Sequence, residues 1–185
     1  MSDAPYGPAL GFLETSSIAS GILATDAMMK KANVELLLTT IVPRGKYLVM
    51  VGGPVADVES ALAAGRESAG KTVLDEFLIQ GVHPQLPAAI KGRVAVPRLD
   101  AVGVIETKEV ASAIYAGDAA VKAAAVTLIE ARNQPGGKGL VVLTGDVGAV
   151  EAAVAAGVAA VKKEGMLVGK VVIPAAHEAL KRALL

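Results

Sequence analysis

The stretch ALGFLETSSIASGILATDAMMKKANVELL, residues 9–37, recurs in altered form as AVGVIETKEVASAIYAGDAAVKAAAVTLI, residues 101–129. The offset of 92 residues holds without a gap as far as Gly65 and Gly157, with 27 identities in 57 aligned positions. Beyond Gly65 the second copy is two residues longer, so that His83 aligns with His177 at an offset of 94. Self-similarity at a fixed offset indicates one domain that has been duplicated and fused.

Each copy predicts the same order of secondary-structure elements. Apolar residues alternate with breaks at Pro and Gly in a way that favours strand, helix, strand, strand, helix, strand and a short final helix. This order is that of the ferredoxin-like split βαβ arrangement, in the α+β class. Ser and Thr after the first strand offer N-caps for the first helix. In the first copy the elements are expected at 9–13, 18–29, 34–41, 46–51, after 54, 72–80 and after 83.

The repeat also sets the expected domain boundaries. We expect an N-terminal tail at 1–8, a first domain at 9–91 and a second domain at 101–185. The segment between them, 92–100, is the linker, and Pro97 stiffens it.

The composition excludes several functional classes. Hydrophobic residues make up 53% of the chain but aromatic residues only 3%, so the core is expected to consist of small aliphatic side chains. Lys+Arg and Asp+Glu both number 18, and a chain without net charge argues against nucleic acid as a main partner. The absence of Cys excludes disulfides and thiolate-bound metals or Fe–S clusters. A mean hydropathy of +0.53 favours surface buried between subunits.

Neither a secretory signal nor a membrane span is expected. The first eight residues contain no basic stretch and no apolar core. No apolar run of 18 residues is free of charges. The expected compartment is the cytoplasm.

One motif looks like a phosphate-binding loop but stands in the wrong context. Residues 65–72, GRESAGKT, match the pattern G-x-x-x-x-G-K-[ST]. That loop needs a strand before it and a helix after it, whereas here a helix is expected before and a strand after. The equivalent stretch, 157–164, lacks the motif. We therefore interpret Gly70 as the end of a helix.

Four titratable residues occupy equivalent positions in the two copies: His83 and His177, and Glu14 and Glu106. One His per domain without clustered carboxylates makes a poor metal site, which favours an N-cap or packing role. The two glutamates suggest acid–base chemistry, but bonds to backbone donors at a helix start are the simpler interpretation. Because no nucleophile stands beside a base, we expect no enzymatic activity, no metal and no cofactor.

Four sequence motifs are spread over nearly the whole chain. They are G-[FV]-[LI]-E-T at 11–15 and 103–107, D-A-x-x-K-x-A-x-V at 26–34 and 118–126, T-G-D-V-G-A-V-E-A-A-V-A-A-G at 144–157, and I-P-x-x-H-E-x-L at 173–180. These motifs resemble the bacterial microcompartment (BMC) shell domain. Two fused copies in unpermuted order resemble the tandem-domain shell proteins, in particular those of propanediol-utilising compartments. The resemblance implies a structural shell protein that forms a homotrimer, a pseudohexameric tile, within a hexagonal sheet of shell proteins.

The resemblance also implies the roles of particular residues. In the family, the loop between the second and third strands lines a central pore for small metabolites. Contacts at the tile edge correspond to Lys30, Asn33 and Lys122. Three copies of Arg44 around one axis would favour anions, or Arg44 pairs with Glu130 and leaves the pore neutral. The pore-lining residues are Val42, Pro43, Arg44, Gly45 and Lys46 in the first loop, and Gln134, Pro135, Gly136, Gly137 and Lys138 in the second.

Two departures from the family pattern affect these expectations. Some relatives hold an Fe–S cluster through a cysteine in the first pore loop, but here the matching position is Val42 or Pro43. A frequent edge arginine, two residues before the final His, is replaced by Gly81 in the first copy and Ala175 in the second. The alternative to a shell tile is a ferredoxin-like trimer that binds a small-molecule ligand at its axis.

Overall fold

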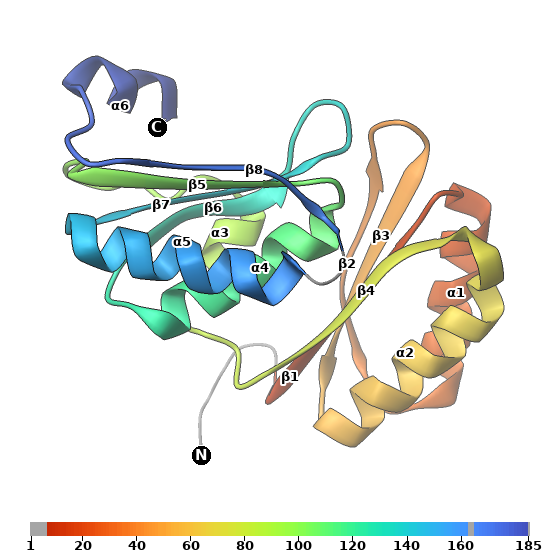
Figure 1. Cartoon of the computed structure of the whole chain (residues 1–185). Helices are drawn as coiled ribbons and strands as arrows, with labels where there is room; N and C mark the ends of the chain where they lie inside the picture. Colours follow the sequence, from red (N-terminus) through yellow and green to blue (C-terminus); the bar gives the residue numbers. More distant parts are fainter. Residues whose placement is uncertain (1–6, 163–164, 185) are drawn as a thin grey trace. The chain divides into compact units, whose positions relative to one another are not determined.

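The computed structural model describes residues 7–162 and 165–184, and it divides the chain into two compact units. The first unit contains the described residues up to Val82 together with Pro135–Gly137. The second unit contains the rest of the described chain from His83 onward. Figure 1 shows the elements of both units in the colours of the sequence.

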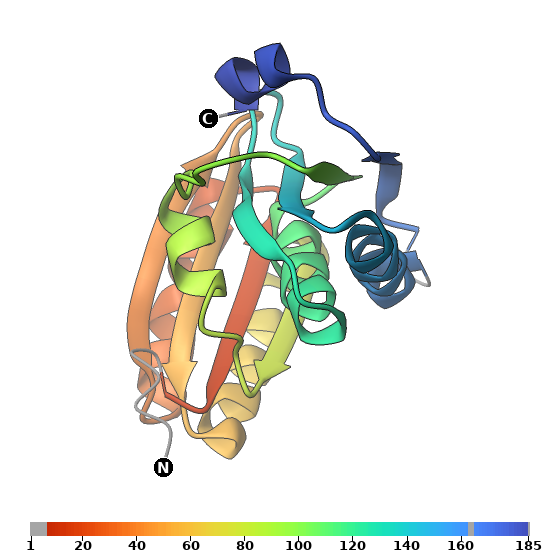
Figure 2. The same cartoon turned by 90° about the vertical axis from the view of Figure 1, so that its left-hand side faces the viewer.

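The first unit is a four-stranded antiparallel sheet with two helices on one face (Figure 1; Figure 2). The strand order is β2-β3-β1-β4, which is the order of the ferredoxin-like arrangement. The α+β class predicted from the sequence is therefore confirmed. The elements are β1 (Ala9–Thr15), α1 (Ile18–Lys31), β2 (Glu35–Val42), β3 (Lys46–Gly53), α2 (Val55–Ala69), the short 3-10 turn η1 (Gly70–Thr72) and β4 (Val73–Gln80).

The second unit repeats this architecture with the strand order β6-β7-β5-β8. It also contains α3, which packs against β6 and α4. In the sequence prediction this helix closes the first domain at residue 91. The elements are α3 (Leu86–Lys91), β5 (Ala101–Thr107), α4 (Val110–Ala123), β6 (Thr127–Asn133), β7 (Gly139–Gly145), α5 (Val147–Lys162), β8 (Leu167–Ile173) and α6 (Glu178–Leu184).

The two sheets share even their irregularities. The pairing of β2 with β3 shifts register between Leu36 and Leu38, and that of β6 with β7 shifts between Leu128 and Glu130, 92 residues later. A bulge changes the twist of a strand and re-aims its side chains. Its presence at equivalent positions shows that the duplication preserved the backbone as well as the sequence.

Glycines on the central strands allow the helices to pack closely. A Cβ added at Gly11 would lie 2.7 Å from Val58 Cγ1, and one added at Gly103 would lie 2.7 Å from Val154 Cγ2. Many of the fully buried side chains are small and aliphatic, Ala61 among them. The core is thus built from small side chains in close contact, as the composition predicts.

The local signals predicted for the helices are confirmed in two places. The Ser17 hydroxyl caps α1 by accepting a hydrogen bond from Ser20 N at 3.3 Å. Gly70 follows α2 with φ +55°, and β4 begins after the 3-10 turn. The stretch that resembles a phosphate-binding loop therefore runs from helix to strand, the reverse of what that loop requires. None of the helices in the described part of the chain has the length and apolar character needed to span a bilayer.

Candidate functional site

The first hairpin loop presents an arginine at its tip. The loop residues Pro43, Arg44 and Gly45 join β2 to β3 and all three are exposed. Arg44 has φ +73° and Gly45 has φ +74°, so two successive residues are left-handed. That conformation is uncommon for a residue other than glycine and costs about 1–2 kcal/mol, so the fold around the loop must impose it. Within the described residues no ion pair involves the Arg44 guanidinium.

The second hairpin loop is longer and richer in glycine. It runs from Gln134 to Lys138, and Gln134 N donates a hydrogen bond to Lys138 O at 2.8 Å across its base. Gly136 and Gly137 have φ of +88° and +76°, in the region that glycine enters without steric cost. Pro135, Gly136 and Lys138 are exposed. Both predicted pore loops are thus tight turns with left-handed residues.

A glutamate at the end of the first strand pairs with the lysine that follows the hairpin loop, in both copies. Glu14 Oε1 lies 2.7 Å from Lys46 Nζ, and Glu106 Oε1 lies 2.6 Å from Lys138 Nζ. The first pair is buried, with side-chain exposures of 0% and 10%, whereas the second is 37% and 48% exposed. The sequence prediction for the two glutamates was acid–base chemistry or bonds to backbone donors, and it did not include these ion pairs. The signal that could have revealed the pairs is that Glu and Lys both recur at the same offset.

Lys46 is one of the predicted pore residues that the structure buries. Its ammonium group also donates to Gly137 O at 2.5 Å, inside the first unit. Val42 is buried as well, with no exposed surface. In this chain the solvent-facing part of the first loop therefore consists of Pro43, Arg44 and Gly45.

The carboxylate considered as a partner for Arg44 already has cationic neighbours. Glu130 is fully buried on β6, and its Oε2 accepts a hydrogen bond from Arg132 Nε at 2.9 Å. Its other oxygen lies 3.3 Å from Arg93 Nε. Gln134 Nε2 is a further donor to Oε2 at 3.4 Å. Two arginines thus neutralise this carboxylate, which disfavours the alternative of a pore made neutral by an Arg44–Glu130 pair.

The predicted edge residues lie at the ends of the first helix of each copy and are exposed. Lys30 Nζ lies 2.6 Å from Asp26 Oδ2, one turn earlier on α1. Lys122 forms the equivalent ion pair with Asp118 on α4. Asn33 is exposed just after α1. The three residues are accessible, as a contact at the rim of a tile requires.

The two histidines make the same local contact. His83 Nδ1 accepts a hydrogen bond from Gln85 N at 3.3 Å, and His177 Nδ1 accepts one from Ala179 N at 3.1 Å. His177 directly precedes α6, and its bond to Ala179 N, in the first turn, is that of an N-cap. His83 does not cap α3, because the N-cap of that helix is Gln85 and it has no side-chain cap bond.

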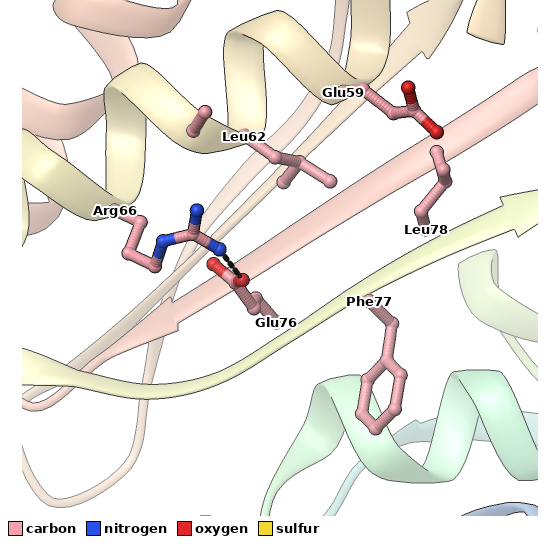
Figure 3. A pocket seen from close by; sticks show the side chains of 7 residues that line it. Glu59, Leu62, Arg66, Glu76, Phe77 and Leu78 are labelled. Carbon is pink, nitrogen blue, oxygen red and sulfur yellow. Dashed lines mark hydrogen bonds and ion pairs between the residues drawn. The ribbon is translucent and has the colours of Figure 1, made fainter.

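A shallow groove between α2 and β4 carries no catalytic arrangement. Its polar groups are Arg66 on α2 and Glu76 on β4, which pair with each other, and Glu59, which lies farther along α2 (Figure 3). The remaining lining residues are Leu62, Ala63, Phe77 and Leu78.

Comparison with known proteins agrees with this architecture. The family model described as the BMC domain matches the chain twice, at residues 9–82 and 101–176. The chain belongs to the BMC-domain family. It is 41% identical over 178 residues to the bacterial microcompartment shell protein PduT of Citrobacter freundii, covering 95% of this chain and 97% of PduT. The predicted family and the unpermuted tandem order are confirmed.

Further relatives of the BMC family include a shorter shell protein and a solved structure. Shell protein PduA of Salmonella typhimurium is 41% identical over 85 residues, which cover 46% of this chain and 90% of PduA. A crystal structure of a microcompartment protein from Desulfitobacterium hafniense DCB aligns with a TM-score of 0.79 and 47% identity, covering 94% of this chain and 98% of that one. The protein is thus a microcompartment shell protein of the BMC family, similar to PduT.

Proposed function

We propose that three copies of this chain form a pseudohexameric shell tile with a central pore. The observation that carries the proposal is the pair of BMC domains in one chain, combined with similarity to PduT over almost the full length of both proteins. PduA aligns with only one half of this chain. A ring built from six single domains can be built from three chains that each carry two domains. Such a closed cyclic assembly buries the charge-poor surface that the composition predicts.

In this proposal the two hairpin loops alternate around the axis and line the pore. Three Arg44 side chains supply positive charge, supported by their exposure and by the absence of an ion-pair partner within the described residues. The first-loop lysine, Lys46, lies at the base of the loop beside Glu14 and adds little field because the pair is neutral. Rings of arginine select anions electrostatically. The pore therefore passes small anionic or polar metabolites.

The rim of the tile uses Lys30, Asn33 and Lys122 to contact other shell proteins in a hexagonal sheet. Their exposure supports this assignment. The protein acts in the shell of a cytoplasmic microcompartment, as a structural and transport component without catalytic activity. It carries no thiolate-bound Fe–S cluster, because its sequence contains no Cys.

Light scattering on the purified protein tests the proposal. The expected mass is three times 18.6 kDa, or about 56 kDa. A monomer, or a hexamer of full-length chains, would contradict it. The alternative, a trimer that holds a ligand at its axis, predicts the same mass but saturable binding of a metabolite and no sheets.

A further inference from the structure

The second hairpin loop lies directly against the first one. Gly137 is buried, although the two residues before it, Pro135 and Gly136, are exposed. A Cβ added at Gly137 would lie 2.6 Å from Pro43 O and 2.9 Å from Lys46 Cε. A real Cβ does not approach a backbone oxygen so closely, so the missing side chain of Gly137 is what lets the two loops come together.

A buried lysine holds the second loop in this place. Lys46 Nζ donates a hydrogen bond to Gly137 O at 2.5 Å. The same ammonium group lies 2.7 Å from Glu14 Oε1, and the Glu14 side chain has no exposed surface. A buried carboxylate keeps its cationic partner in place, because separating the two leaves an uncompensated charge in the protein interior. The donor that Gly137 O meets is therefore fixed by the first sheet.

In the described part of the chain, the second loop is otherwise held at its base. Gln134 N donates a hydrogen bond to Lys138 O at 2.8 Å, which closes the loop where it meets the strands. The tip contains two successive glycines, Gly136 and Gly137, and glycine loses more conformational freedom on ordering than any other residue. The position of the tip thus depends on its contact with Lys46.

We propose that Lys46 and Gly137 are positioning residues of the pore, and that the bond between them sets the width of the opening. The proposal rests on the assembly proposed above, in which both loops line the pore. Three copies of the chain place three such contacts around the axis. The two loops of each chain then move as one body, and the opening keeps a fixed width. Both residues act through the loops and not on the solute.

The contact also fixes the place of the positive charge. Arg44 directly follows Pro43, whose backbone oxygen is the atom nearest to the added Cβ at Gly137. A ring of arginines discriminates between solutes more strongly when it is narrow, because the Coulomb energy between charges falls with their distance. Release of the second loop therefore weakens discrimination by size and by charge together.

Two variants release the second loop by different routes. Gly137→Ala places a methyl group against Pro43 O. The double variant Glu14→Gln with Lys46→Met removes the donor without leaving a buried charge, and so avoids the larger loss of stability expected from Lys46→Met alone. Gly81→Ala is the control for backbone strain. Gly81 has φ +57°, left-handed like Gly137 at +76°, but a Cβ there meets no atom within 4 Å.

A nitroxide label on Pro135→Cys reports the position of the second loop in the full-length protein. The label attaches only there, because the natural chain has no Cys. Electron paramagnetic resonance then measures the distances among the three labels of a trimer. We expect a narrow distribution of distances in the labelled parent and in Gly81→Ala, and a broad one in both release variants. A narrow distribution in either release variant, or a broad one in the parent, overturns the proposal.

Anion flux across planar bilayers tests the consequence for the pore, with chloride and the larger anion glutamate as probes. The unlabelled parent and Gly81→Ala should discriminate between the two anions, and both release variants should lose that discrimination. Unchanged discrimination would mean that Lys46 and Gly137 only stabilise the fold. Light scattering separates this failure from failure of the tile. Trimers of three times 18.6 kDa, about 56 kDa, with unchanged discrimination overturn the positioning role alone, whereas monomers overturn the proposed assembly and the pore with it.

Discussion

Removing the lysine of the buried Glu–Lys pair should destabilise the protein far more than removing the lysine of its exposed counterpart. Lys46→Met leaves the Glu14 carboxylate, which has no exposed surface, without its ammonium partner. Breaking a buried pair in this way costs about 3–5 kcal/mol, because the remaining charge cannot be solvated. Lys138→Met removes a partner from Glu106, whose side chain is 37% exposed. Water compensates there, and the expected cost is about 0–1 kcal/mol.

Urea unfolding followed by circular dichroism, at one chain concentration for all variants, measures this difference. Lys46→Met should lower the midpoint by more than about 1 M, from the usual urea slopes of about 1–3 kcal/mol per M. Lys138→Met should lower it only slightly. Adding Glu14→Gln to Lys46→Met should recover part of the loss, since no buried charge then remains.

Equal destabilisation by Lys46→Met and Lys138→Met would refute this reasoning. So would a double variant, Glu14→Gln with Lys46→Met, that is less stable than Lys46→Met alone. Either result would mean that packing of the lysine stem, rather than the charge of the pair, holds the first loop in place.

Four further outcomes are expected. Arg44→Glu should reverse an anion preference of flux across planar bilayers or intact shells, and unchanged selectivity would place Arg44 outside the pore. The double variant Lys30→Ala and Lys122→Ala should still form trimers by light scattering but fewer sheets in electron micrographs; sheets as extensive as those of the parent would contradict the edge assignment. Reconstitution with iron and sulfide should give no Fe–S absorbance, and a stable cluster with a defined paramagnetic signal would disprove this. Gly139→Ala should cost about 1–3 kcal/mol of stability, because its Cβ would lie 2.4 Å from the Cβ of Ala113. The control Gly148→Ala should not destabilise the protein, because no atom lies within 4 Å of the added Cβ. Equal shifts of the thermal unfolding midpoint for the two variants would contradict this packing.

The fold was predictable because the sequence contains the same domain twice. A strand or helix that is uncertain in one copy is supported by the other, as the helical positions of Ile22 and Ile114 illustrate. The turn residues Gly45 and Gly137 mark the hairpins in the same way. The structure moves strand ends by one or two residues, with β1 continuing to Thr15 and β3 to Gly53.

The site was less predictable because burial depends on the surroundings of a residue and not on its type. Glu14 and Glu106 have the same sequence context, yet one is completely buried and the other is partly exposed. Arg44 itself gives no sign of its left-handed conformation, whereas Gly136 at the equivalent position of the second copy does, because glycine enters that region without steric cost. The docking of α3 on β6 joins segments that follow different strands, so no local pattern reveals it.

Electron microscopy of the purified full-length protein tests the shell-tile proposal most directly. We predict flat hexagonal sheets whose repeating unit has six similar lobes with threefold symmetry around a central opening, two lobes from each chain. Dispersed particles that never form sheets, at protein concentrations where light scattering detects trimers, would contradict the assignment of this chain as a shell tile.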